Sequence, residues 1–356
     1  MENRKKTVYV GLSGGVDSSV SAARLIKAGY SVVGVFIRTW VPDFLDCNIE
    51  AERLDAMRVA ATLGIPFRTL DAEEAYKNEV ADYMIREYQA GRTPNPDVMC
   101  NKFVKFGAFL DFALAEGADM VATGHYAEVK HEGESYHLHR GKDPLKDQSY
   151  FLWTLTPHEL ERIVFPIGDS VKSAIREEAG RYSLPTAAKN DSQGICFLGH
   201  VDMKDFLMHY IESKEGNVLD EAGNSIGTHD GAIFYTIGQR NGFSVKTVGD
   251  SSSPHYVVSK DVEKNTITVS PRLTTISGKT LILSDVNQIS EDFGEECEAQ
   301  FRYRQKPFKV GISRTEEGHV MLTVLENSIE TPSAGQSCVL YRGDRCLGGG
   351  IINTIL

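Results

Sequence analysis

A run of glycines and serines near the start of the chain has the composition of a phosphate-binding loop. The segment Gly11 to Ser19 reads GLSGGVDSS and follows a short β-forming run. Adjacent glycines permit positive φ and close backbone approach, and Ser18 and Ser19 suit the cap of a helix expected from Val20 to Lys27. The N–H groups at the start of that helix would bind a polyphosphate. The alternative is an ordinary strand-turn-helix in which the glycines serve only geometry.

The run differs from two well-known glycine-rich loops. No lysine follows its glycines, so it does not match GxxxxGK[ST], and it does not match GxGxxG.

Two cysteines lie in loops that suit a reactive thiol. Cys100 follows a loop stiffened by two prolines, just before an expected helix, with Lys102 and Lys105 nearby. The helix dipole and the positive charge would favour its thiolate, although a buried structural cysteine in a rigid loop is an equal alternative. Cys196 lies in a second loop bracketed by glycines. Beside a nucleotide site, two such thiols suit sulfur transfer through a persulfide and disulfide exchange.

The pairing of these two cysteines does not follow from the sequence alone. Because they are far apart along the chain, we expect one loop to move, so that the protein without its substrate holds them well apart. The other cysteines receive no chemical role. Cys297, Cys338 and Cys346 are expected to be packing residues, and Cys47 is flanked by acidic residues that would raise its pKa.

Strands that alternate with helices must position these loops. Buried strands are expected at Val8 to Leu12, Val32 to Phe36, Phe67 to Leu70 and Met120 to Thr123. Helices are expected from Glu50 to Leu63, with Leu54, Met57, Val59 and Ala61 on the apolar face, and from Phe106 to Glu116, each followed by a glycine. This order indicates an α/β fold with a parallel sheet covered on both faces, where ligands bind beyond the carboxyl ends of the strands.

The pattern changes after about residue 210, where turns and short strand-like segments replace the alternation. From 279 to the end nearly every segment is short, β-branched and bounded by turns, which is typical of a small β-barrel. We therefore predict three domains: 1–210 with the phosphate loop and both cysteine loops, a small central domain at 211–278, and a barrel at 279–356.

Composition excludes several classes of protein. The 356 residues are 41% hydrophobic and 24% charged, and no apolar run is long enough to span a bilayer. The basic start leads directly into a strand, which argues against secretion. Six cysteines without a CxxC pair argue against a disulfide scaffold, a zinc ribbon or a metal cluster. A reducing cytoplasm, and no resident metal ligands, are expected.

A net charge of -11 means that any polyanionic partner must bind to a local basic surface. Phe301 to Lys309 interleaves four cations with three aromatic residues, which suits phosphate contacts and base stacking, although a solvated strand face would look similar. Arg140 to Lys146 adds three cations against one acid.

The motifs in their order resemble one family nearly from end to end. The loop Gly11 to Ser18 resembles the PP-loop, SGGxDS, of the ATP pyrophosphatases. Seven further motifs follow it along the chain: RTPNPDVMCNKFVKF from Arg92, ATGHYA from Ala122, KDQSYFL from Lys146, DSQGICFLG from Asp191, GAIFYTIGQRNG from Gly231, FRYRQ from Phe301 and GQSCVLY from Gly335. Together they resemble the bacterial-type tRNA-specific 2-thiouridylases. The fold that this resemblance implies is a nucleotide-binding α/β domain, a small central domain and a C-terminal β-barrel.

The resemblance also implies roles for individual residues. ATP would be bound by the phosphate loop and by two residues on the adenosine side: Gly11, Leu12, Ser13, Gly14, Gly15, Val16, Asp17, Ser18, Ile37 and Gly124. Asn95, Pro96 and Asp97 would contact the target uracil, Cys100 would be the nucleophile, and Cys196 would carry the persulfide. The expected tRNA contacts are His125, Lys146, Asp147, Gln148, Arg302, Tyr303 and Gln336. The chain departs from the family pattern at Arg38 and Thr39, which puts local contacts there in doubt.

The implied reaction is 2-thiolation of the wobble uridine of tRNAs for Lys, Glu and Gln, with ATP and Mg²⁺ as cofactors and a sulfur-relay protein as partner. Adenylation turns the uracil C2 oxygen into a good leaving group, and sulfur then replaces it, either as freed sulfide or by direct persulfide attack. Asp97 would accept the N3 proton or bond the base edge, unless it only caps the next helix. Without the resemblance, His125 would be interpreted as a histidine at a strand end whose hydrogen bonds are satisfied within the fold.

Three other hypotheses stay open at this point. An amidating PP-loop enzyme would share the loop without needing Cys100 and Cys196. A cluster-dependent RNA thiolase would show CxxC, and a non-catalytic RNA-binding module would not need the phosphate loop.

Overall fold

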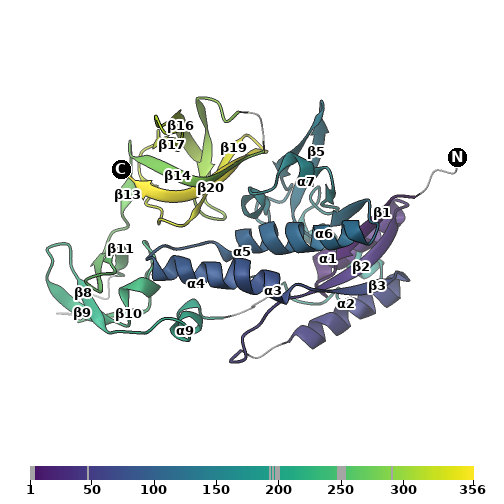
Figure 1. The fold of residues 1–356 in the computed structure, drawn as a ribbon, viewed down its shortest axis with the longest axis horizontal. Coiled ribbons are helices and arrows are strands. Elements are labelled where there is room, and N and C mark those ends of the chain that lie inside the picture. The colour runs from purple at the N-terminus through teal and green to yellow at the C-terminus, as the bar shows by residue number, and fades with distance from the viewer. Residues whose placement is uncertain are drawn as a thin grey trace.

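The N-terminal region is built around a five-stranded parallel sheet with the order β3-β2-β1-β4-β7, of which β1, β2 and β3 are labelled in Figure 1. The computed structural model describes residues 5–45, 48–191, 194, 196, 201–246, 254–289 and 292–356. The five strands are β1 (Thr7–Gly11), β2 (Ser31–Arg38), β3 (Phe67–Asp71), β4 (Met120–Ala122) and β7 (Ile163–Val164).

Helices cover both faces of this sheet, as the alternation predicts. Val8 and Val10 of β1 pack with Leu25 and Val59 on one face, whereas Tyr9 packs with Phe109 on the other. The α-helices are α1 (Val16–Lys27), α2 (Ile49–Leu63), α3 (Glu73–Tyr76), α4 (Asp82–Gln89), α5 (Pro96–Met99), α6 (Phe109–Ala115), α7 (Pro157–Leu160), α8 (Lys172–Arg181) and α9 (Met203–Met208). Two π-helices, η1 (Lys77–Ala81) and η2 (Cys100–Ala108), and two 3-10 turns, η3 (Ser149–Leu152) and η4 (Ala232–Phe234), complete the helical segments. Among the described residues, no helix has the length and apolar character needed to cross a bilayer.

The carboxyl end of β1 is the point where the strand order reverses. The chain passes from β1 to β2 on one side, and β4 later joins the other side of β1. Crevices at such points are the usual ligand sites of open parallel sheets. The loop that begins at Gly11 leaves the sheet there.

Three expectations about these elements are wrong in detail. The helix after the loop begins at Val16, not at Val20, so Ser18 and Ser19 lie inside it. Strand β3 is half-exposed because it forms the edge of the sheet.

The third wrong expectation concerns which residues of α2 form its buried apolar face. Leu54, Met57 and Ala61 are exposed, and the buried residues are Ala56, Val59 and Ala60.

The central region is a second sheet with the order β10-β9-β8-β12-β11. Its strands are β8 (Gly216–Leu219), β9 (Ser225–His229), β10 (Phe243–Val245), β11 (Tyr256–Asp261) and β12 (Thr266–Ser270). Its core includes Val218 and Ile267 and continues into Met84 of α4 and Phe206 of α9. Helix α4 of the first region therefore also supports the central sheet.

The C-terminal region is a closed barrel of six strands, as the sequence predicts. They are β14 (Thr280–Gln288), β15 (Glu296–Gln300), β16 (Phe308–Arg314), β17 (Val320–Val324), β19 (Ser337–Arg342) and β20 (Arg345–Ile355), and the pairing of β14 with β20 closes the ring. A small separate pair joins β13 (Thr275–Ile276) to β18 (Ile329–Glu330).

A hairpin from the first region extends the barrel sheet. Strands β5 (Ala127–Glu132) and β6 (Ser135–Arg140) pair with each other, and His139 and Leu138 of β6 pair with β20. No local sequence pattern indicates this junction, because it joins segments about 200 residues apart. The domain limits at 210 and 278 stay predictions.

Candidate active site

The phosphate loop has glycine where no larger residue fits. Gly14 has φ +68°, and a Cβ atom there would lie 2.7 Å from the backbone oxygen of Glu52 in α2. Gly124 follows β4, and a Cβ atom there would lie 2.7 Å from the backbone nitrogen of Ser18. The loop is therefore held between α2 and the segment after β4 by two close backbone approaches.

The loop serines brace the loop from inside. Gly15, not a serine, is the N-cap of α1. Ser18 Oγ lies 3.2 Å from Ser13 Oγ and donates to the carbonyl oxygen of Gly15 at 3.3 Å, and Ser19 Oγ donates to the same oxygen at 2.6 Å. The first N–H groups of a helix have no partner within it, so the start of α1 can bind an anion.

Ile37 provides an apolar contact beside the loop. It is buried near the end of β2, and its Cδ1 atom would lie 3.8 Å from a Cβ atom on Gly11. Its neighbour Arg38 pairs with Asp71 and Glu73 at 2.6 and 3.1 Å. The departure from the family pattern at Arg38 is therefore accommodated by a surface ion pair.

The two loop cysteines lie in contact. Cys100 Sγ donates to Cys196 Sγ across 3.5 Å. The expectation that they would be held well apart is wrong. The structure brings Cys196 against Cys100, the first residue of η2.

The backbone of Cys196 is held from both sides. Its N–H donates to Asp97 Oδ1 at 2.9 Å, and its carbonyl oxygen accepts from Tyr76 Oη at 2.8 Å. Asn95, rather than Asp97, caps α5 through its side-chain oxygen and the N–H of Val98. The alternative that Asp97 is a helix-capping residue is therefore wrong, and Asp97 positions Cys196.

The environment favours ionisation of Cys196, not of Cys100. The hydrogen bond from Cys100, with the nearby Lys105 ammonium, lowers the pKa of Cys196 to about 7. Burial raises the pKa of Cys100 well above its ordinary value. The expected thiolate at Cys100 is wrong because α5 continues directly into η2, which leaves Cys100 inside a helical run and fully buried. Burial also raises the pKa of Asp97.

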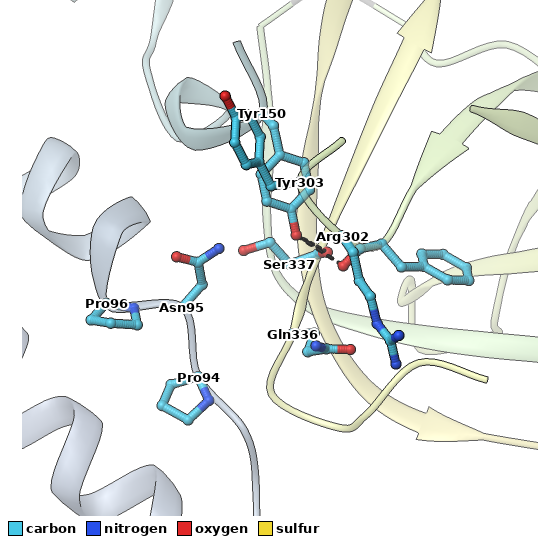
Figure 2. Close-up of a pocket in the computed structure, with 9 residues that line it drawn as sticks. Pro94, Asn95, Pro96, Tyr150, Arg302, Tyr303, Gln336 and Ser337 are labelled. Carbon is cyan, nitrogen blue, oxygen red and sulfur yellow. Dashed lines mark hydrogen bonds between the residues drawn. The ribbon is translucent and has the colours of Figure 1, made fainter. Parts of the chain in front are cut away.

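A pocket of about 170 Å³ lies between the Asn95 loop and the barrel (Figure 2). Five of the residues that line it are predicted from the sequence to bind the base or tRNA: Asn95, Pro96, Arg302, Tyr303 and Gln336. Tyr150 and Ser337 are the main additions to this set. Segments some 200 residues apart in the chain thus meet at one cavity.

Polar contacts fix the barrel side of this pocket. Tyr150 Oη donates to the carbonyl oxygens of Phe301 and Ser337 at 2.9 and 3.1 Å. Arg302 pairs with Glu330 at 2.8 Å. Of the three aromatic residues in the 301–309 run, only Tyr303 reaches the pocket rim without being buried. Phe301 and Phe308 belong to the barrel core, so Tyr303 is the aromatic residue of this run that is available for stacking.

Comparison with known proteins identifies the family. Family models match residues 6–200 (tRNA methyl transferase HUP domain), 204–271 (tRNA methyl transferase PRC-barrel domain) and 278–352 (Aminomethyltransferase beta-barrel domain). The tRNA-specific 2-thiouridylase MnmA of Akkermansia muciniphila is 43% identical, over 98% of this chain and 99% of that protein. The protein of the same name from Streptococcus sanguinis is 42% identical, over 99% and 96%. This chain belongs to the tRNA-specific 2-thiouridylase family.

A solved structure adds little to this assignment. A 4-thiouridine synthetase–RNA complex with bound ATP is 17% identical over 57% of this chain and 50% of that chain, with a TM-score of 0.35. That likeness is too low to support an argument about function.

Four of the residues predicted to contact tRNA have hydrogen-bond or ion-pair partners within this member of the 2-thiouridylase family: His125, Lys146, Asp147 and Gln148. His125 is buried, with Nδ1 2.7 Å from Thr123 Oγ1, and burial lowers its pKa well below the ordinary value. Lys146 pairs with Asp191 at 2.7 Å.

The next two residues also serve the fold. Asp147 accepts hydrogen bonds from Arg140 and from the N–H of Gly141, both at 2.9 Å. Gln148 accepts from the N–H of Tyr126 at 3.0 Å. Contacts of these four residues with tRNA stay predictions.

Sequence reasoning missed several residues of the site. Tyr150 lay within a quoted motif but had no assigned role, and Tyr76, Lys172 and Arg176 carried no signal because their neighbours form no motif. Of the motif from Asp191 to Gly199, only Asp191, Gly194 and Cys196 are among the described residues, and Cys47 also lies outside them. The cysteines of the barrel, Cys297, Cys338 and Cys346, are buried packing residues, as predicted.

Proposed function

We propose that this protein converts the wobble uridine of tRNA, U34, to 2-thiouridine at the expense of ATP and releases AMP and pyrophosphate. The contact between the Cys100 and Cys196 thiols carries the proposal. A phosphate loop alone is compatible with many acceptors, whereas two facing thiols next to a nucleotide-binding fold suit persulfide chemistry. The close relatives are named for the same reaction.

In the first step, residues Gly11 to Ser18, with Ile37 and Gly124 beside the adenosine, would hold ATP. The uracil C2 oxygen attacks the α-phosphorus, and the bond to pyrophosphate breaks. Asn95, Pro96 and Asp97 would hold the base. Because Asp97 is buried with a raised pKa, it is suited to exchange a proton with N3.

In the second step, sulfur from a Cys196 persulfide replaces the AMP-bearing oxygen. Either the terminal sulfur attacks C2 and Cys100 then attacks Cys196 Sγ, or Cys100 attacks first and frees hydrosulfide. Both routes end with a Cys100–Cys196 disulfide, which an external thiol must reduce. A sulfur-relay protein would reload Cys196, whose low pKa provides the thiolate that attacks the donor persulfide.

Mg²⁺ would accompany the nucleotide. Among the described residues, no cluster of three or more histidine, cysteine or acidic side chains could hold a metal ion. The Mg²⁺ ion would be bound mainly through the phosphate oxygens of ATP. When bound, it would neutralise charge on the departing pyrophosphate.

The remaining assignments concern tRNA and cell compartment. His125, Lys146, Asp147, Gln148, Arg302, Tyr303 and Gln336 would contact tRNAs for Lys, Glu and Gln. A reducing cytoplasm would keep the described cysteines as the free thiols seen in the structure.

The direct test is thiolation in vitro. The protein is incubated with ATP, Mg²⁺, a sulfur donor and unmodified tRNA, and 2-thiouridine and AMP are measured by mass spectrometry. Cys100→Ser and Cys196→Ser should each abolish 2-thiouridine while ATP still binds, and Cys297→Ser in the barrel serves as the control. Full thiolation by either active-site variant would disprove the two-cysteine mechanism.

A further inference from the structure

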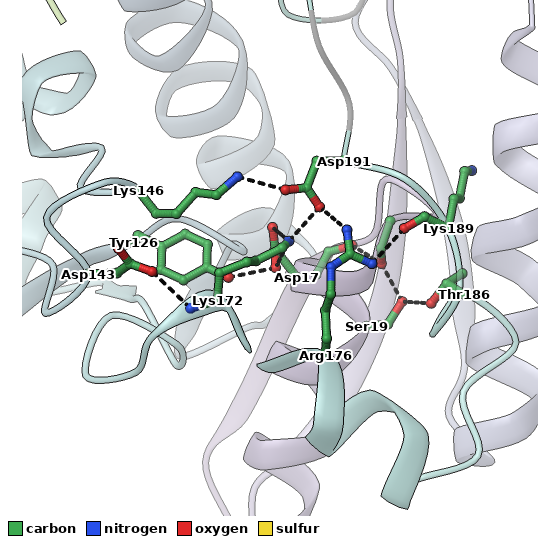
Figure 3. A network of polar contacts seen from close by, with 12 residues as sticks. Asp17, Ser19, Tyr126, Asp143, Lys146, Lys172, Arg176, Thr186, Lys189 and Asp191 are labelled. Atoms are coloured by element: carbon green, nitrogen blue, oxygen red, sulfur yellow. Dashed lines mark hydrogen bonds and ion pairs between the residues drawn. The ribbon is translucent and has the colours of Figure 1, made fainter. Parts of the chain in front are cut away.

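Three cations converge on one carboxylate beside the phosphate loop (Figure 3). Asp191 lies 2.7 Å from Lys146 Nζ, 2.9 Å from Lys172 Nζ and 2.5 Å from Arg176 Nη2. Lys172 Nζ also contacts the two carboxylate oxygens of Asp17 at 2.7 and 2.8 Å. Since Asp17 is the second residue of α1, this cluster adjoins the start of the phosphate-binding helix.

The charges of the cluster are close to balance. Besides Asp17 and Asp191, Asp143 lies against it, because its carboxylate accepts the backbone N–H of Lys172 at 2.9 Å. Burial alone would raise the pKa of Asp191, but hydrogen bonds from Lys146 and Lys172 outweigh it and lower the pKa to about 2. The Lys172 side chain is 12% exposed, so solvent screens it weakly. Because each of the three cations already has a carboxylate partner, a further anion can bind here only by displacing one of these carboxylates.

Other cations near the loop are already paired. Arg24 of α1 is bound to Glu178 and Asp169 at 2.6 and 2.9 Å, and Lys189 is bound to Asp55 at 2.9 Å. The loop itself contains no lysine. Helix α8, which carries Lys172 and Arg176, therefore supplies the charge that the glycine loop lacks.

We propose that Lys172 and Arg176 form the cationic side of the phosphate site, and that Asp191 occupies the place of an anion until the polyphosphate chain of ATP displaces it. This inference rests on the proposed function, because it assumes that the loop binds ATP. A polyphosphate carries more charge than one carboxylate and accepts more hydrogen bonds, so it competes well for an ammonium and a guanidinium. Asp191 is then an internal competitor that lowers the affinity for ATP.

The proposal predicts that substitutions of Lys172 and of Asp191 change the affinity for ATP in opposite directions. Lys172→Gln should weaken binding of ATP and of inorganic pyrophosphate by about tenfold or more, because a charge-assisted hydrogen bond is lost. AMP, which lacks the terminal phosphates, should be affected much less. Asp191→Asn should bind ATP and pyrophosphate several-fold more tightly, and Lys172→Arg should recover part of the loss. Arg181→Gln, an exposed change on the same helix, is the matched control.

Binding is measured by calorimetry on the full chain with ATP, pyrophosphate and AMP as separate probes, and circular dichroism checks folding. Unchanged pyrophosphate affinity in Lys172→Gln, or equal losses for AMP and pyrophosphate, would overturn the proposal. If Lys172→Gln does not fold, the Asp191→Asn variant tests the proposal instead. Unchanged or weaker binding of ATP and pyrophosphate by that variant would also overturn the proposal. Failure of the wild-type protein to thiolate tRNA would instead overturn the proposed function, so the two failures are distinguishable.

Discussion

Cys100 Sγ and Cys196 Sγ lie 3.5 Å apart, although the two residues are 96 positions apart in the chain. This separation is longer than the roughly 2.05 Å of a disulfide bond, and both residues are free thiols. Only a small movement is needed to join them. The relationship makes the transient disulfide of the proposed mechanism geometrically accessible without rearrangement of the fold.

Mild oxidation should therefore link this pair first. Treatment with diamide should yield a Cys100–Cys196 disulfide before any bond involving Cys297, Cys338 or Cys346, which are buried in the barrel. Peptide mapping under non-reducing conditions identifies the bond. A first disulfide between any other pair would contradict the observed contact.

The reactivity of Cys196 should depend on pH with an apparent pKa of about 7. The thiolate is the reactive form, and a lowered pKa means that it persists down to about pH 7 and is lost below. Alkylation of Cys196 should slow about tenfold for each further pH unit. Mass spectrometry of iodoacetamide-labelled peptides measures the rate.

Two substitutions test the cause of this low pKa. Cys100→Ala removes the hydrogen-bond donor and Lys105→Met removes the nearby ammonium, so each should raise the pKa of Cys196. Lys102→Met, on an exposed residue of the same π-helix, should leave it unchanged. An alkylation profile that stays near pH 7 in both active-site variants would show that another group holds the thiolate.

Asp97→Asn separates the two uses of Asp97. The amide oxygen still accepts the N–H of Cys196, which now bonds to Asp97 Oδ1 at 2.9 Å, but it cannot exchange a proton. Thiolation should fall by at least about 100-fold, the usual contribution of a general acid or base, while alkylation of Cys196 is unchanged. Near-normal thiolation would leave Asp97 only its positioning role.

Tyr303 should stabilise the bound tRNA by stacking. It lies at the rim of the pocket with its ring 4.6 Å from that of Phe151. Base–aromatic stacking contributes about 1–3 kcal/mol, so Tyr303→Ala should weaken tRNA binding by about 5- to 150-fold, whereas Tyr303→Phe should keep it. Filter binding measures the affinity, and Arg314→Gln on the barrel surface is the control. An equal loss in both Tyr303 variants would argue against stacking.

Local features were predictable from the sequence because short-range geometry determines them. The sequence of strand, glycine-rich turn and helix around Gly11 is encoded within a short segment, although the helix begins at Val16, four residues earlier than expected. The structure places Asn95 and Tyr303, which the family motifs single out, around one pocket, and their contacts with the base and with tRNA stay predictions.

Features that depend on tertiary packing were not predictable. Cys100 has a helix-start sequence before it, but π-helix η2 continues that helix and buries the thiol, which reverses its expected pKa shift. Lys172 lies in a polar helix with no motif, so only the folded chain shows that it reaches Asp17. In the same way, the hairpin β5–β6 joins the barrel through contacts that no local pattern encodes.

Gly124→Ala tests whether the close approach of the β4 segment shapes the phosphate loop. An added Cβ atom would lie 2.7 Å from the backbone nitrogen of Ser18 and 2.9 Å from the backbone carbon of Asp17, so the loop must shift. ATP binding should weaken by at least about 1.4 kcal/mol, which is tenfold in Kd. Gly180→Ala is the matched control, because a Cβ atom there meets nothing within 4 Å and lies in helix α8. That variant should bind ATP normally and gain about 1 kcal/mol of unfolding free energy from the better helix propensity of alanine. Calorimetry and urea denaturation measure the two quantities, and normal ATP binding by Gly124→Ala would show that the loop tolerates the displacement.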